Sequence, residues 1–271
     1  MISCKEYFEI EKENIKNKLD DKDLFYTPRL DIFQVGDNPA SNVYIANKMK
    51  DCEYVGIDSA LHKYEENVSE ETLREDIDEA SVCFYCDGII LQLPVPEHIN
   101  PIKVLKNNIH PFQDVDGFLY PEVNSPCTPT GIMDYLKYNN ISVDGKNCVV
   151  IGRSDIVGKP LARMLLEQNA TVTICHSHTP EDEMIKYAEN ADIVFVAVGK
   201  PKWLKFAAKN KDVIVIDIGI NRDEDGKLCG DVDYDYMTAQ GCYVTPVPGG
   251  VGLLTRIALL KNAIGRSVIN E

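Results

Sequence analysis

The stretch CVVIGRSDIVGKPLARMLLEQ, residues 148–168, constrains the fold more than any other part of the chain. Its first four residues are apolar, mostly β-branched and too few for a helix, so they predict a buried strand. After a turn containing Gly152 and Gly158, apolar side chains recur at helical spacing. A strand, a glycine turn and a helix start offer free backbone N–H groups and the positive end of a helix dipole. The stretch therefore predicts a nucleotide site.

The glycine spacing departs from the usual dinucleotide fingerprint. Ser154 and Val157 stand where G-x-G-x-x-G has its second and third glycines. A plain glycine turn between a strand and a helix of any α/β protein is therefore the alternative interpretation.

The end of the next predicted strand, residues 171–175, distinguishes between two dinucleotides. An NAD site usually has an acidic residue there for the ribose hydroxyls. Here the strand is followed by His176, Ser177, His178 and Thr179, and the first carboxylate is Glu181. Arg153 and these hydroxyl groups suit a 2′-phosphate, which favours NADP over NAD. Two polar histidines on an ordinary loop are the alternative.

The rest of the C-terminal half continues the α/β pattern. Further strands are expected at 192–198, 213–218 and 242–244, and the acidic segment 223–235 is expected to be a surface loop. The glycines of PVPGGVG, residues 246–252, precede a predicted helix at 253–264. This second glycine-rich helix start suits an anion or the carboxamide of a cofactor, and a simple helix-entry turn is the alternative.

The N-terminal half predicts a β-α-β-α-β order. A charged amphipathic helix at 3–19 comes first, strands are expected at 30–35, 57–64 and 87–93, and helices at 40–54 and 70–82. Such alternation implies a parallel sheet, with ligands beyond the carboxyl ends of its strands. The proline-rich segment 94–130 is expected to hold the inter-domain region.

Composition excludes several classes of protein. A chain of 271 residues, 44% hydrophobic, suits two modest domains. A net charge of −15 argues against nucleic acid or an anionic membrane as a partner. The N-terminus is charged and no apolar run is long enough to span a membrane, so a cytoplasmic protein is expected. Cys83 and Cys86 form a lone C-x-x-C without a second pair or a nearby histidine, so no metal site is predicted.

Six segments, in order, resemble one known family. They are GDNPASNVYIANKMKDCEYVGI, GIILQLPVP, DVDGF, PCTPTGI, VVIGRSDIVGKP and PVPGGVG. Over nearly its whole length the chain is similar to the bifunctional methylenetetrahydrofolate dehydrogenase/methenyltetrahydrofolate cyclohydrolases. The resemblance implies an N-terminal α/β domain and a C-terminal Rossmann-like parallel sheet, with the active site in the cleft between them. It also implies tetrahydrofolate substrates, NADP and a homodimer.

The resemblance assigns boundaries and site residues. It implies a folate-binding catalytic domain at 1–123 and an NADP-binding domain at 124–253, with a final helix, 254–271, packing back toward the first. Tyr44 and Lys48 match a Y-x-x-x-K pair, Gln92 matches the glutamine of LQLP and Asp116 the second aspartate of DVDG. Cofactor-binding positions are expected at Gly152, Arg153, Ser154, Ser177, Ile220 and Thr255. In one departure, Leu253 and Leu254 replace the more usual Pro-Met.

The chemistry of these residue types agrees with the resemblance. Tyr44 and Lys48 are four residues apart, so both project from one helical face, where the ring can stack on a pterin and the amine can polarise a one-carbon centre. Gln92 could hold the lysine, and Asp116 could accept two N–H bonds from a pterin. The alternatives are a surface Tyr-Lys pair, a turn-capping amide, and Asp114 in place of Asp116.

The resulting hypothesis is a bifunctional enzyme of folate one-carbon metabolism, of the kind that supplies purine biosynthesis. It oxidises 5,10-methylenetetrahydrofolate with NADP and hydrolyses the methenyl product to 10-formyltetrahydrofolate, with Lys48, Gln92 and Tyr44 as catalytic residues. Two alternatives stay open, a monofunctional dehydrogenase and a non-catalytic NADP-binding sensor.

Overall fold

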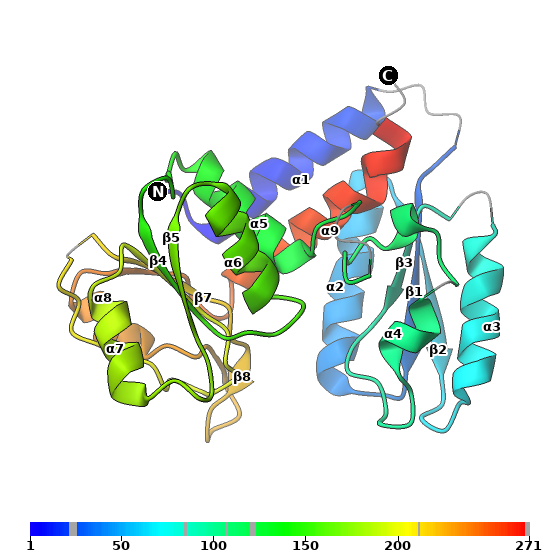
Figure 1. The fold of residues 1–271 in the computed structure, drawn as a ribbon. Helices are drawn as coiled ribbons and strands as arrows, with labels where there is room; N and C mark the ends of the chain where they lie inside the picture. Colours follow the sequence, from blue (N-terminus) through cyan, green and yellow to red (C-terminus); the bar gives the residue numbers. More distant parts are fainter. Residues whose placement is uncertain (22–25, 84–85, 107, 120–122, 211, 269–271) are drawn as a thin grey trace. The chain divides into compact units, whose positions relative to one another are not determined.

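A computed structural model describes residues 1–21, 26–83, 86–106, 108–119, 123–210 and 212–268 (Figure 1). The chain divides into two compact units. The N-terminal unit contains residues 9–127 and 256–271, and the C-terminal unit contains residues 1–8 and 128–255. None of the helices in the described ranges is long and apolar enough to cross a membrane.

The N-terminal unit contains a parallel three-stranded sheet in the order β2-β1-β3. The strands are β1 (Arg29–Val35), β2 (Asp58–Tyr64) and β3 (Gly88–Leu91). The helices are α2 (Pro39–Val55), α3 (Glu70–Ser81) and α4 (Pro101–Leu105), with parts of α1 (Cys4–Asp20) and α9 (Val251–Val268) and the 3-10 turn η1 (Pro111–Gln113). The predicted β-α-β-α-β order and the parallel sheet are confirmed.

Helix α2 begins and ends where its flanking residues require. The side chain of Asn38 accepts from the backbone N–H groups of Ala40 (2.9 Å) and Ser41 (3.2 Å), two donors that the helix itself leaves unpaired. Gly56 ends the helix in the left-handed region, with φ of 88°. These caps fix where the Tyr44 and Lys48 side chains leave the helix.

Most of the proline-rich segment packs inside the N-terminal unit. Its apolar residues Ile99, Val104, Leu105 and Ile109 are buried against Leu73 and Ile77 of α3. The two units divide at Cys127. The prolines here therefore begin or end short helices and turns, and only the end of the segment is a boundary between the two units.

The C-terminal unit contains a parallel five-stranded sheet in the order β10-β7-β6-β4-β5. The strands are β4 (Asn147–Ile151), β5 (Thr171–Cys175), β6 (Ile193–Val196), β7 (Ile214–Asp217) and β10 (Tyr243–Val244). The helices are α5 (Cys127–Tyr138), α6 (Gly158–Glu167), α7 (Glu181–Glu189) and α8 (Tyr234–Ala239), and β8 (Asn221–Arg222) pairs with β9 (Leu228–Cys229) as a small antiparallel ribbon. The predicted Rossmann-like sheet is confirmed.

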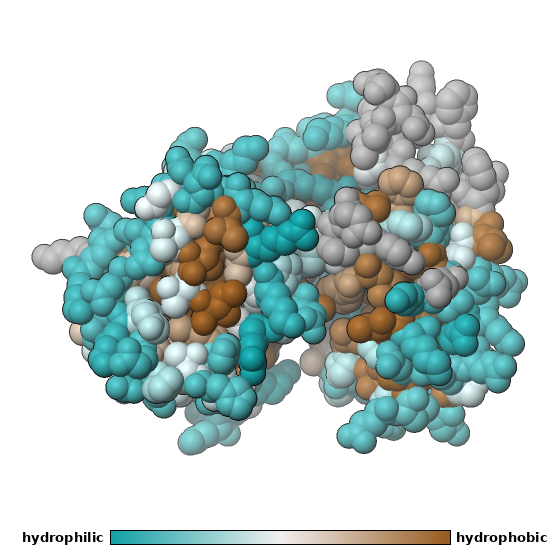
Figure 2. All heavy atoms as spheres, in the orientation of Figure 1, coloured by the Kyte–Doolittle hydropathy of each residue, from teal (hydrophilic) through white to brown (hydrophobic). Residues whose placement is uncertain are grey.

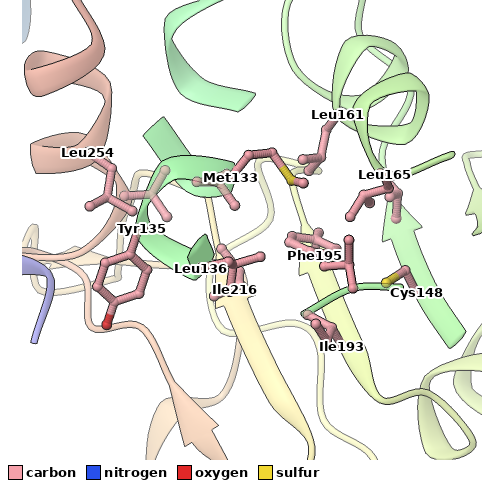
Figure 3. Close-up of a cluster of buried hydrophobic side chains, with 14 of the residues drawn as sticks. Met133, Tyr135, Leu136, Cys148, Leu161, Leu165, Ile193, Phe195, Ile216 and Leu254 are labelled. Atoms are coloured by element: carbon pink, nitrogen blue, oxygen red, sulfur yellow. The ribbon is translucent and has the colours of Figure 1, made fainter. Parts of the chain in front are cut away.

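Both faces of β4 are buried, which explains its continuous apolar sequence. Cys148 and Val150 face one core cluster, and Val149 and Ile151 face another. Figure 3 shows the first cluster, in which side chains of α5 and α6 converge on the strands. Leu254, at the position where the sequence departs from the family pattern, is fully buried in the same cluster.

The sequence predicted that the acidic segment 223–235 is a surface loop, and this prediction is wrong for part of the segment. It contributes to the β8–β9 ribbon and to α8, and Asp231 is completely buried. Its acidic composition misled the prediction because backbone N–H groups, which composition does not reveal, solvate this carboxylate.

Candidate functional site

Helix α2 and the end of β3 bring three of the predicted site residues together. The Nζ atom of Lys48 donates to Oε1 of Gln92 at 3.2 Å and lies 4.8 Å from the centre of the Tyr44 ring. The Nε2 atom of Gln92 donates to the carbonyl of Leu93 at 2.8 Å, which turns the amide oxygen toward the lysine. Lys48 is 5% exposed, so its amine is largely withdrawn from water.

Asp116 shares this polar environment. Burial raises the pKa of the Asp116 carboxyl, the Lys48 charge opposes that rise, and Asp114 adds to it. Burial also raises the pKa of the Tyr44 hydroxyl, and the charge of Asp116 adds to that rise. Because such effects act over short range, these residues form one electrostatically coupled cluster within the N-terminal unit.

The two aspartates of DVDG have different surroundings. The Asp114 carboxylate accepts from the backbone N–H groups of Phe118 (3.3 Å) and Leu119 (2.7 Å), so it closes the turn. Among the residues that the structure describes, no hydrogen bond reaches the Asp116 carboxylate, although its backbone oxygen accepts from Cys127 at 3.3 Å. Asp116 is therefore the aspartate whose carboxylate can accept from a ligand.

Two residues that sequence reasoning missed support this cluster from α9. Asn262 donates to the carbonyl of Val115 at 2.8 Å, which holds the backbone beside Asp116. Arg256 donates through Nε to the Asp51 carboxylate of α2 at 2.6 Å. Asn262 and Val115 lie 147 positions apart, and no local pattern in the sequence could relate them.

The glycine turn after β4 can be built only from glycine. Gly152 has φ of +130°, and a Cβ atom there would lie 2.3 Å from the carbonyl oxygen of Ala197. A Cβ atom on Gly158 would lie 2.3 Å from the carbonyl oxygen of Gly152. The turn thus folds tightly against the end of β6 and the start of α6, which only residues without a Cβ atom allow.

Ser154 organises the N-terminus of α6. Its hydroxyl oxygen accepts from the backbone N–H groups of Val157 (3.2 Å) and Gly158 (3.4 Å). The hydroxyl hydrogen is not used in either bond, so it can be donated to an anion at the helix N-terminus.

Arg153 and Ser177 lie beyond the ends of paired strands. Ile151 of β4 is opposite Cys175 of β5, and each candidate stands two residues further along its own strand. Adjacent strands are about 4.8 Å apart, so both residues lie at one edge of the sheet. Both are exposed, and the loop between Cys175 and Glu181 contains no acidic residue.

The histidine loop is held by its own groups. The backbone N–H of His178 donates to Nδ1 of His176 at 3.2 Å, and the backbone N–H of His176 donates to the Thr179 hydroxyl at 3.0 Å. These two bonds fix the backbone of the loop at both ends.

The remaining cofactor candidates differ in availability. Ile220 is 64% exposed in the loop after β7, so its side chain is accessible to a ligand. The Thr255 hydroxyl donates to the carbonyl of Val251 at 3.1 Å and lies 3.0 Å from the Thr128 hydroxyl. Thr255 thus serves the start of α9, and a cofactor would find chiefly an acceptor there.

Two family models cover most of the chain. Residues 2–116 match the tetrahydrofolate dehydrogenase/cyclohydrolase catalytic domain, and residues 126–269 match the NAD(P)-binding domain of the same family. The bifunctional protein FolD of Agathobacter rectalis is 45% identical over 244 residues, which cover 87% of this chain and 86% of that protein.

Solved structures agree along the full length. The bifunctional FolD enzyme of Campylobacter jejuni is 39% identical with a TM-score of 0.91, covering 99% of this chain and 98% of that one. The Trypanosoma brucei dehydrogenase-cyclohydrolase, solved with NADP cofactor and an inhibitor, is 30% identical with a TM-score of 0.87 and the same coverage.

Proposed function

The chain belongs to the tetrahydrofolate dehydrogenase/cyclohydrolase family, and on that basis we propose the function that its site supports best. It is a bifunctional enzyme of folate one-carbon metabolism that uses NADP. It oxidises 5,10-methylenetetrahydrofolate to the 5,10-methenyl form and hydrolyses that product to 10-formyltetrahydrofolate. The observation that carries the proposal is the buried Lys48 amine bonded to Gln92, beside the available Asp116 carboxylate.

Asp116 and Tyr44 bind the folate in this proposal. A carboxylate without another hydrogen bond accepts two N–H bonds from a pterin, and the half-buried Tyr44 ring offers a flat apolar face for stacking. Both groups lie in the N-terminal unit, which we assign as the folate-binding catalytic domain. The location of the folate between the two domains stays a prediction.

Lys48 carries the hydrolytic step. A water adds its oxygen to the methenyl carbon and loses both of its protons as that oxygen becomes the formyl oxygen. One proton goes to the nitrogen that leaves when one carbon–nitrogen bond of the bridge breaks, and the other is released to solvent. Because Gln92 accepts one N–H of Lys48, the amine is held in one orientation. It can donate to the added oxygen and transfer the proton to the departing nitrogen.

The C-terminal unit holds the cofactor. When bound, NADP supplies the hydride acceptor for the oxidation. The protein's part is to position it: the glycine turn and α6 take the phosphates, and Arg153 with Ser177 takes the 2′-phosphate. Hydride transfer needs accurate positioning more than a protein acid or base.

A homodimer is part of the proposal. Strand β5 is the edge strand of its sheet, and Ile174 on β5 and Leu166 on α6 are 43% and 66% exposed. Figure 2 shows apolar atoms at the surface over β5 and the neighbouring α6. An open strand edge beside apolar side chains favours pairing with a second copy.

Light scattering tests this dimer surface. It should give a dimer mass for the parent protein and a monomer mass for Ile174→Lys, and a dimer mass for Ile174→Lys would show that the dimer forms through another surface.

One assay tests the proposed function against its alternatives. Absorbance at the methenyl-folate band is followed after adding methylene-folate, with and without NADP, and after adding methenyl-folate alone. The bifunctional enzyme produces methenyl-folate only with NADP and removes it faster than the uncatalysed rate. A monofunctional dehydrogenase would produce it without removing it, and a sensor would do neither.

A further inference from the structure

Two carboxylates of the C-terminal unit are buried away from water. Asp217 ends β7 and is 2% exposed, and Asp231, two residues beyond β9, is fully buried. A buried charge destabilises the folded state unless hydrogen bonds compensate it. The hydrogen-bond donors around these two carboxylates show which loops the carboxylates hold in place.

Asp231 binds two loops at once. Its Oδ2 atom accepts from the backbone N–H groups of Val198 (2.6 Å) and Gly199 (3.1 Å). Its Oδ1 atom accepts from the backbone N–H of Lys200 (2.8 Å) and from Nδ2 of Asn221 (2.8 Å). One side chain therefore fixes three successive residues of the loop after β6 and the residue next to Ile220 in the loop after β7.

Asp217 fixes Asp231 in turn. Its Oδ1 atom accepts from the backbone N–H groups of Gly219 (3.1 Å) and Asp231 (3.0 Å), and its Oδ2 atom accepts from Val232 (2.9 Å). The fit leaves no room for larger residues, because a Cβ atom on Gly219 would lie 2.2 Å from Cγ of Asp231. Likewise, a Cβ atom on Gly230 would lie 1.8 Å from Oδ2 of Asp217.

These loops lie on a particular side of the nucleotide site. Strands β6 and β7 lie on one side of β4, and β5 lies on the other. The carbonyl of Ala197, at the end of β6, contacts Gly152 so closely that no Cβ atom fits. In such sheets a dinucleotide lies across the carboxyl ends of the strands, where the strand order reverses. Because the 2′-phosphate is assigned to the ends of β4 and β5, the nicotinamide end of the cofactor is expected at the loops after β6 and β7, which Asp231 holds.

We propose that Asp231 is a positioning residue for the nicotinamide half of the cofactor. It does not touch the cofactor. It acts through the backbone of residues 198–200 and through Asn221, which fixes the exposed Ile220. The inference rests on the proposed NADP-dependent function.

Two ligands separate this role from a general structural one. NADP contains both halves of the dinucleotide, whereas 2′,5′-ADP contains only the adenosine half with the 2′-phosphate. Asp231→Asn keeps the shape but loses the charge and places an NH2 group against N–H donors. Where only the ordered loops bind the nicotinamide, losing one charge-assisted bond that orders them lowers the apparent affinity about tenfold or more. Asp233→Asn is the matched control, because Asp233 caps α8 and Asn caps a helix equally well.

The expected result is an affinity for NADP lowered at least about tenfold in Asp231→Asn, with 2′,5′-ADP affinity within about twofold of the parent. Dehydrogenase kcat falls as well, whereas methenyl-folate hydrolysis, assigned to the N-terminal unit, keeps the parent rate. Asn221→Ala removes a single bond and should show the same pattern more weakly, so the test survives if Asp231→Asn does not fold.

Other results overturn the inference. Equal losses for NADP and 2′,5′-ADP would show that Asp231 only stabilises the domain, and unchanged NADP affinity in both variants would show that the loops do not need it. A parent protein that binds neither ligand would instead refute the proposed function, and this inference with it.

Discussion

Two sets of carboxylates, Asp217 with Asp231 in the C-terminal unit and Asp116 in the N-terminal unit, are used in opposite ways. In the C-terminal unit, Asp217 and Asp231 are surrounded by backbone N–H donors, and the groups assigned to the cofactor are glycine backbone and exposed side chains. In the N-terminal unit, Asp116 has no hydrogen bond to its carboxylate among the residues described, and it faces the Lys48 charge. The first arrangement holds the loops that are proposed to bind the cofactor, and the second leaves a carboxylate able to accept hydrogen bonds from a ligand.

The contrast follows from what each unit has to do. A cofactor that carries its own chemistry needs a rigid shape, which hydrogen-bonded loops supply. A hydrolytic step needs protein groups that exchange protons, so those groups cannot be fully used by the fold. We therefore expect single side-chain changes to abolish chemistry in the N-terminal unit and to reduce affinity in the C-terminal unit.

The largest effect should come from Lys48→Met, which removes the amine and keeps the apolar stem. Hydrolysis of methenyl-folate should fall by about 10²–10⁴-fold, the usual contribution of a general acid or base, while dehydrogenase turnover is reduced but detectable. Lys50→Met, on the exposed side of the same helix, is the control. Both activities are measured on folded protein, and near-parental hydrolysis by Lys48→Met would refute the assignment.

A pH series tests whether the Asp217 charge is committed to the fold. Burial raises its pKa from 3.8 to about 6, so the folded state binds this proton more tightly than the unfolded chain does. The corresponding stability is fully present below about pH 4 and is lost as the pH rises through 6; two pKa units correspond to roughly 3 kcal/mol.

Asp217→Asn cannot titrate, so the free energy of unfolding of the parent minus that of the variant should decrease between pH 4 and 7. Urea unfolding at several pH values measures this difference. A difference that does not change with pH would mean that the Asp217 carboxyl ionises as easily in the folded protein as in the unfolded chain.

Arg153→Ala should weaken NADP much more than NAD. A charge-assisted contact to a 2′-phosphate contributes about 1.5–3 kcal/mol, roughly 10- to 150-fold in the ratio of the two affinities. Arg163→Ala is the control, because Arg163 is exposed in the same unit and pairs with Glu167. Equal losses for the two dinucleotides would remove Arg153 from the 2′-phosphate site.

Asp116→Asn should have the smallest effect of the series, because asparagine keeps one acceptor in place. Folate affinity should fall about tenfold, the value of one bond to a charged acceptor, while NADP affinity stays unchanged. Separate titrations of the two ligands measure this, with the exposed Asp58→Asn as control. Unchanged folate affinity would transfer the role to Asp114 or to the backbone.

The sequence alone determined the order of the elements and the identity of most candidates. Periodicity is a local property, so strand β4, the glycine turn and α6 could be predicted from one continuous stretch, and Tyr44 and Lys48 could be placed on one helical face. The resemblance to the family then named Gln92, Asp116 and the cofactor positions.

Only the tertiary structure decided which polar groups are bound and which are available. Asp114 and Asp116 are two residues apart in DVDG, and only their hydrogen bonds distinguish a turn-closing carboxylate from an available one. Asp231 lies in a segment that its composition assigns to the surface, yet it is buried by N–H groups of residues 198–200. The physical reason is that desolvation and hydrogen bonding depend on distances between residues remote in the chain, which local sequence patterns do not encode.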